Sequence, residues 1–256
     1  FRKLKEYCDQ KGIIFLSTPH SSKEDVDLVA ELCLAIKVGS GDLTNLPILK
    51  YIAGKKLPII LSTGMATLEE VREAVDVILP INKELILLHC TTNYPTPLDE
   101  VNLKAIQTIM KEFNLPTGYS DHTEGIEVST AAVALGASVI EKHFTLDRNL
   151  PGPDHKASLE PSELREMVAK IRNVEKALGS GIKKPFPSEL ETAKVARKSI
   201  VAKINILKGA KITKDMMPIK RPGTGIKPKY LDKVFGKRVK KDIKKDSLIS
   251  WDKIVR

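Results

Sequence analysis

Two histidines follow consecutive predicted strands, and imidazole suits a metal site. His122 ends the segment TGYSDH, and His143 lies 21 residues further on, in VIEKHFT. Imidazole nitrogen is a good ligand for manganese, iron, zinc and similar metals. The carboxylates of Asp121, Glu141 and Asp154 lie nearby in the sequence. The alternative is a structural pair of hydrogen-bonded histidines, and the spacing alone does not decide between the two.

Hydroxyl side chains and one lysine lie at the ends of the other predicted strands. They are Thr18, Lys37, Ser40, Ser62, Thr63 and Ser120. Hydroxyls, a cation and backbone amides are the groups that bind a phosphate oxyanion. A single Ser or Thr often only satisfies loop backbone, but several of them converging with a lysine favour an anion site.

The elements that must position these residues alternate between strand and helix over residues 1–183. Apolar runs typical of buried parallel strands lie at 12–18, 35–40, 58–64, 85–91, 117–122 and 139–145. Their starts are 22 to 32 residues apart, which is the length of one strand–helix unit. Polar residues end nearly every strand, and in a barrel these ends meet at one mouth. We therefore predict an α/β fold, a TIM-type (β/α)8 barrel rather than an open doubly wound sheet.

Six of the eight strands of such a barrel are visible in the sequence. The segment FRKLKEYCDQKG is predicted to be helical, and the chain begins with Phe1 rather than Met. We expect two earlier strands to be missing, so that the barrel domain is N-terminally incomplete and the 256-residue chain alone is less active than a longer protein.

The composition changes near a Gly- and Pro-rich stretch at residues 179–189. Residues 184–256 hold 21 Lys and Arg against 7 Asp and Glu, whereas residues 1–183 hold 21 against 25. We predict a barrel domain over 1–183, a linker over 184–189 and a small β-rich domain over 190–256. The lysine-rich stretch KRVKKDIKKD lacks the interleaved aromatic residues of a nucleic-acid patch, so a solvated surface explains it better.

The remaining composition excludes several classes of protein. No apolar run approaches the roughly 18 residues that a membrane span needs. Three cysteines without CxxC spacing (Cys8, Cys33 and Cys90) argue against a disulfide framework and indicate a cytoplasmic protein. No GxGxxG follows the first visible strand, so the dinucleotide-binding fingerprint is missing.

Taken together, these stretches resemble the sialic acid synthase family, the phosphoenolpyruvate-dependent nonulosonate synthases. The matching segments are FLSTPHS, IKVGSGDLTNLPIL, ILSTGMA, LLHCTTNYPTP, GYSDHT, IEKHFTLDR and GPDHKASLEP. The segment KRPGTGI and its surroundings resemble the antifreeze-like (SAF) domain of that family. The resemblance covers essentially all 256 residues.

The resemblance implies a transferase of sialic acid biosynthesis, of the N-acetylneuraminate or legionaminate synthase type. Such an enzyme condenses phosphoenolpyruvate with an N-acylated hexosamine, either N-acetylmannosamine or a 2,4-diacetamido hexose. The products are a nonulosonic acid and phosphate, which leaves by C–O cleavage. A divalent metal, usually Mn²⁺, would sit on His122 and His143 and polarise the sugar aldehyde. The segment GPDHKAS resembles the neuraminate and legionaminate branches more than the pseudaminate branch.

The resemblance also implies roles for individual residues. Phosphoenolpyruvate would be bound by Thr18, Lys37, Ser40, Ser62 and Ser120, together with Thr92 or Asn93, between which the motif TTNYP does not decide. Tyr94 and Asp154 would hold the sugar, and Glu141 would lie close to the metal or sugar. These three are the catalytic residues that the resemblance implies. Arg221 would reach the acyl-amino group from the partner chain of a domain-swapped homodimer.

Two functions of other classes remain as alternatives. A barrel module could bind an anion without turnover, which predicts no metal dependence. A basic nucleic-acid-binding protein led by residues 184–256 would show binding that falls steeply with salt. The histidines and carboxylates at the strand ends argue against both.

Overall fold

The structure, a computed structural model, describes residues 1–20 and 22–255. Its residues group into two compact units, 1–180 and 181–256, which are described separately. The expected linker at 184–189 stays a prediction, and the helix α8 (Pro187–Ala196) begins within it. Within the described ranges, no helix is long and apolar enough to cross a membrane.

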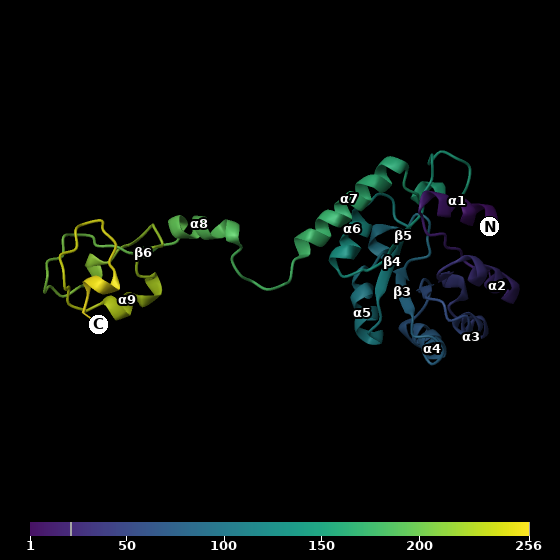
Figure 1. The fold of residues 1–256 in the computed structure, drawn as a ribbon, viewed down its shortest axis with the longest axis horizontal. Helices are drawn as coiled ribbons and strands as arrows, with labels where there is room; N and C mark the ends of the chain where they lie inside the picture. Colours follow the sequence, from purple (N-terminus) through teal and green to yellow (C-terminus); the bar gives the residue numbers. More distant parts are fainter. Residues whose placement is uncertain (21, 256) are drawn as a thin grey trace. The chain divides into compact units, whose positions relative to one another are not determined.

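Five parallel strands form the sheet of the first unit, and they follow one another across it in chain order (Figure 1). They are β1 (Ile36–Val38), β2 (Ile59–Ser62), β3 (Leu85–Cys90), β4 (Thr117–Asp121) and β5 (Ile140–Lys142). The helices are α1 (Arg2–Lys11), α2 (Lys23–Leu32), α3 (Leu46–Gly54), α4 (Leu68–Ile78), α5 (Lys104–Phe113), α6 (Glu127–Ala134) and α7 (Pro161–Leu178). Helices α3 to α6 each connect two neighbouring strands, which is the wall of a (β/α) barrel.

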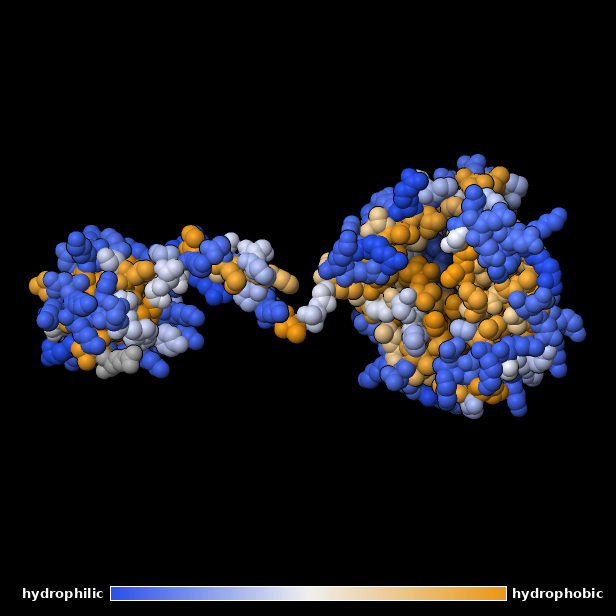
Figure 2. All heavy atoms as spheres, in the orientation of Figure 1, coloured by the Kyte–Doolittle hydropathy of each residue, from blue (hydrophilic) through white to orange (hydrophobic). Residues whose placement is uncertain are grey.

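The prediction of a strand over residues 12–18 is wrong. This segment has no regular secondary structure, so the sheet has five strands and not six. One backbone hydrogen bond, from Lys37 N to Ser17 O at 3.4 Å, reaches β1 from it, which is too little for a strand ladder. Ile13, Ile14 and Leu16 of the segment are exposed. Figure 2 shows a broad apolar area on one face of the first unit, bordered by hydrophilic side chains.

Alternate residues of the strands pack against the helices and form the main core. Ile36, Ile59, Leu61, Leu85 and Leu87 are at most 2% exposed and belong to one cluster with apolar residues of α3 and α4. The helix α4 begins at a capping box in which Thr67 and Glu70 bond each other's backbone amides. Because side chains alternate along a strand, the residues between these apolar ones face the other side of the sheet.

The sheet is strongly curved, as the wall of a barrel must be. Lys37 lies on the edge strand β1 and Glu141 on the opposite edge strand β5, yet Lys37 Nζ is 3.5 Å from Glu141 Oε2. In a flat sheet the four steps between these strands would separate the backbones by about 19 Å, which the two side chains together cannot span. The concave face therefore gathers side chains from both edges, in a half-barrel arc.

The second unit is a small, loop-rich domain with its own core. Its regular elements include the helices α8 and α9 (Leu231–Val234) and an antiparallel pair, β6 (Ser199–Ile200) and β7 (Ile219–Lys220). Single bridges such as Ile206 to Ile243 extend the β structure. Buried Ile, Val and Met side chains form a separate cluster. The β structure matches the predicted β-rich character, and the ten-residue helix α8 begins the domain.

Candidate active site

A polar cluster occupies the concave face of the sheet near the carboxyl ends of the strands. Lys37 Nζ donates to Ser62 Oγ at 2.8 Å and pairs with Glu141 Oε2 at 3.5 Å. Ser120 Oγ donates to Glu141 Oε1 at 2.6 Å. The side chain of Lys37 is 12% exposed and that of Glu141 41%, so the cation lies deep and the carboxylate stays open to solvent. Four predicted site residues thus come together from β1, β2, β4 and β5.

A second group of predicted residues lies around Gly64, just after β2. Ser40 Oγ lies 3.1 Å from Cys90 Sγ and accepts a 3.0 Å hydrogen bond from the Gly64 amide. A β-carbon placed on Gly64 would lie only 2.2 Å from Thr92 Oγ1, so Thr92 also reaches this point. Thr18 is half-buried and lies next to Gly39, the residue before Ser40. The hydroxyls of Ser40 and Thr92 therefore converge, with a backbone amide pointing among them.

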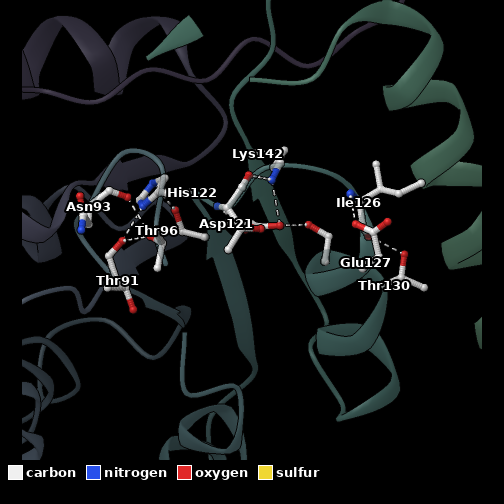
Figure 3. A network of polar contacts seen from close by, with 12 residues as sticks. Thr91, Asn93, Thr96, Asp121, His122, Ile126, Glu127, Thr130 and Lys142 are labelled. Atoms are coloured by element: carbon white, nitrogen blue, oxygen red, sulfur yellow. Dashed lines mark hydrogen bonds and ion pairs between the residues drawn. The ribbon is translucent and has the colours of Figure 1, made fainter. Parts of the chain in front are cut away.

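The two histidines lie close together beyond the ends of β4 and β5. Their ring centroids are 5.4 Å apart. His122 Nδ1 lies 2.8 Å from the carbonyl oxygen of Thr91, so Nδ1 carries the proton and donates it (Figure 3). Nε2 is then unprotonated, and it lies 3.4 Å from Ser120 Oγ. Burial lowers the pKa of His122, and the nearby His143 lowers it further. The hydrogen bond to Thr91 acts in the opposite direction and raises this pKa. A neutral imidazole with Nε2 available is the form that binds a metal.

The pair fits a divalent ion as two ligands of a site that other groups must complete. Among the described residues, no group of three or more His, Cys, Asp and Glu is arranged to hold a metal ion. Water or substrate oxygen would have to supply the other ligands, and such open positions distinguish a catalytic from a structural metal site.

Tyr94 packs against both histidines. Its ring centroid lies 4.1 Å from that of His122 and 5.4 Å from that of His143, in an edge contact with the latter. Burial raises the pKa of the Tyr94 phenol, and Cys90, Asp154 and Glu141 raise it further. The phenol is therefore protonated at neutral pH and can donate a hydrogen bond near the two carboxylates.

Two predicted residues of the first unit are exposed, and a third belongs to the second unit. Asp154 is exposed in the loop after β5, where its carbonyl oxygen accepts a hydrogen bond from Ser158 Oγ at 2.8 Å. Asn93 is exposed, and its carbonyl oxygen accepts from Thr96 Oγ1 at 2.8 Å. Arg221 is an exposed residue of the second unit.

Several residues that shape the site were not predicted from the sequence. Gly64 and Cys90 contact Ser40, and the carbonyl of Thr91 orients His122. Lys142 forms a buried ion pair with Asp121 on the outer side of the sheet, at 3.1 Å. The signal for that pair was present, because SDH and EKH each place a charge on the helix-facing side of a strand, directly before the histidine.

Comparison with known families gives a match to each unit. The profile of the NeuB family matches residues 1–183, and that of the SAF domain matches residues 197–255.

Individual relatives match over nearly the whole chain. The N,N'-diacetyllegionaminic acid synthase of Campylobacter jejuni is 52% identical over 97% of this chain and 75% of its own length. The synthase of the same name from Legionella pneumophila is 46% identical over 98% and 72%. The human N-acetylneuraminate-9-phosphate synthase is 39% identical over 97% and 70%.

Two solved structures are also similar to this chain. The N-acetylneuraminic acid synthetase of Leptospira borgpetersenii, in complex with citrate, is similar with a TM-score of 0.70 at 40% identity, over 74% of this chain and 67% of that one. The spore coat polysaccharide biosynthesis protein SpsE of Bacillus subtilis is similar with a TM-score of 0.66 at 36% identity, over 100% and 77%.

Proposed function

The chain belongs to the NeuB family, and on that premise we propose that it condenses phosphoenolpyruvate with an N-acylated hexosamine to give a nonulosonic acid and phosphate. One observation carries the proposal: the cluster of Lys37, Ser62, Ser120 and Glu141 adjoins the His122 and His143 pair, because Ser120 Oγ lies 3.4 Å from His122 Nε2. An anion site next to a candidate metal site is what joining an enol phosphate to an aldehyde requires.

The deep cation and the hydroxyls form the phosphoenolpyruvate site in this proposal. Lys37 supplies the positive charge and is hydrogen-bonded to Ser62, and the hydroxyl of Ser120 is bonded to Glu141, the ion-pair partner of Lys37. Ser40 and Thr92, beside the Gly64 amide, extend the donor set. This geometry supports Thr92 over Asn93 as the ligand, because Thr92 Oγ1 lies against Gly64. Thr18 lies at the border of this group.

His122 and His143 would hold the divalent ion, which we propose to be Mn²⁺. When bound, such an ion polarises the aldehyde of the open-chain sugar as a Lewis acid. Glu141 would accept a proton from the water that adds to the enol carbon, and it would do so at Oε2. Its Oε1 is hydrogen-bonded to Ser120, whereas Oε2 makes only the longer, 3.5 Å ion pair with Lys37. Tyr94, kept protonated, and Asp154 would bind hydroxyl or amide groups of the sugar.

The sugar in this proposal is N-acetylmannosamine or a 2,4-diacetamido hexose. Relatives named as legionaminic acid synthases and as N-acetylneuraminate-9-phosphate synthase support this class of substrate. We further propose a domain-swapped homodimer in which Arg221 reaches the acyl-amino group in a partner's barrel. A cytoplasmic location is proposed as well, and the free thiols of Cys8, Cys33 and Cys90 are consistent with it.

The test is release of phosphate from phosphoenolpyruvate in the presence and absence of each sugar. We expect release only when an N-acylated hexosamine and Mn²⁺ are both present, with oxygen from labelled water entering the sugar acid and the bridging oxygen leaving in phosphate. His122→Ala should abolish turnover while leaving phosphoenolpyruvate binding largely intact. Binding of phosphoenolpyruvate without turnover, and without any effect of chelator, would favour the anion-binding module instead.

A further inference from the structure

The last pair of the ladder between β4 and β5 is a buried ion pair. Asp121 and Lys142 are register partners, with Lys142 Nζ 3.1 Å from Asp121 Oδ2, and their side chains are 0% and 3% exposed. Both lie on the helix-facing side of the sheet, opposite Ser120 and Glu141. The next residues along the two strands are His122 and His143. The ion pair therefore fixes the two backbones at the point where the histidines begin.

Hydrogen bonds extend this pair to both sides of His122 (Figure 3). The amide and hydroxyl of Thr123 donate to Asp121 Oδ1 at 2.9 and 2.8 Å. Ser129 Oγ, on α6, donates to Asp121 Oδ2 at 2.6 Å, and Lys142 Nζ donates to the carbonyl of Thr123. One network thus contains the residues before and after His122 and the residue before His143.

Stability alone does not account for a pair of this kind. Removing two charges from water is costly, and replacing a buried ion pair by apolar residues of similar volume often leaves a protein equally or more stable. A fully hydrogen-bonded polar network instead specifies one arrangement of the groups it joins. Here the groups it joins are the backbones that carry the two histidines.

We propose that Asp121 and Lys142 are positioning residues for metal binding, which set the separation and direction of the His122 and His143 rings. The inference rests on the proposed function, in which both histidines bind one divalent ion. Replacing a group that orients a metal ligand typically weakens metal affinity 10- to 100-fold. Because Asp121 and Lys142 act through the backbone, we expect the lower end, about tenfold.

The experiment measures Mn²⁺ binding to the full chain by the electron paramagnetic resonance signal of free Mn²⁺, without substrate or turnover. The variants are Asp121→Asn, Lys142→Met and the double variant, with the melting temperature of each recorded in chelator. The double variant leaves no unpaired buried charge, so it should melt above either single variant yet still bind Mn²⁺ about tenfold more weakly than wild type. Ser129→Ala keeps both charges and should weaken Mn²⁺ in the same direction by a smaller factor.

Leu85→Ala is the matched control. Leu85 is 2% exposed at the start of β3, away from the strand ends, so its replacement should lower the melting temperature without changing Mn²⁺ affinity. A double variant with wild-type Mn²⁺ affinity would overturn the positioning role while leaving the proposed function intact. A folded wild-type chain that binds no Mn²⁺ would overturn the metal site of the proposed function, and the positioning role with it.

Discussion

The amide of Gly64 donates a 3.0 Å hydrogen bond to Ser40 Oγ, and a β-carbon on Gly64 would lie 2.8 Å from that same oxygen. The same β-carbon would lie 2.2 Å from Thr92 Oγ1 and 2.8 Å from Cys90 Sγ. The need for glycine here is a need for space, because the residue has no positive φ. Three side chains from different loops and strands meet where only a hydrogen atom fits.

Gly64→Ala should therefore disrupt phosphoenolpyruvate binding. The methyl group must displace Thr92, Cys90 or Ser40, so we expect KM for phosphoenolpyruvate to rise by about tenfold or more, equivalent to at least ~1.4 kcal/mol of binding. Steady-state kinetics with saturating sugar measures this. Gly54→Ala is the control, because nothing lies within 4 Å of a β-carbon there. Equal kinetics for the two variants would contradict a phosphate site at Gly64.

Lys37→Met should lower kcat/KM for phosphoenolpyruvate by about a hundredfold. The lysine is the cation that bonds Ser62 on the concave face, and removing one preorganised electrostatic contact typically costs this much. It also leaves Glu141 without its ion-pair partner. The exposed Lys50 of α3 offers a matched replacement, Lys50→Met, which should have no effect. An unchanged kcat/KM in Lys37→Met would place the phosphate elsewhere.

The pH dependence of stability should include a contribution from His89, outside the metal site. Burial lowers the pKa of His89, whose Nε2 lies 2.9 Å from the carbonyl oxygen of Val101. The unfolded chain protonates this histidine near its ordinary pKa of about 6.5, before the folded chain does. Between the two pKa values the unfolded state binds more protons, so stability falls as the pH falls below about 6.5.

Denaturant melts of His89→Gln at pH 7.5 and pH 5 should show a smaller loss on acidification than wild type, because the variant lacks this proton uptake. The exposed His20 gives the matched control, His20→Gln, which should lose as much stability as wild type. If His89→Gln lost stability with the wild-type slope, the pH effect would have another source.

The repeating strand–helix pattern was enough to predict the barrel wall and five of its strands. The period of the apolar runs is a local signal, and the strands that it predicts at the other five positions are present in the structure. The prediction of a strand over residues 12–18 was wrong because an apolar run shows only that a strand is possible. Whether it becomes one depends on backbone partners, and here a single hydrogen bond reaches β1.

The candidate site, like the fold, was predictable only in part. Residues such as Lys37 and Ser62 were predictable because the strand alternation sends them to one face and the strand ends bring them to one edge. The contacts that orient and surround these site residues were not predictable from the sequence. The carbonyl of Thr91 that orients His122 is a backbone group 31 residues away, and sequence pattern carries no information on such a contact. The crowding at Gly64 likewise depends on three loops meeting in space.

Replacement of Arg221 tests the proposed exchange of domains between two chains. If Arg221 of one chain completes the barrel of the other, Arg221→Ala should raise KM for the sugar far more than KM for phosphoenolpyruvate. Lys220→Ala is the control, since the exposed Lys220 is already paired with Asp246 at 2.6 Å. Mixing Arg221→Ala and Lys37→Ala chains under subunit exchange then distinguishes a swapped dimer from one in which each chain supplies the arginine of its own site. In a swapped dimer, each mixed pair has one site with both changes and one with neither, so activity should recover to about a quarter of wild type. If each chain supplied its own arginine, every site would carry one change, and the mixture would be no more active than its parts.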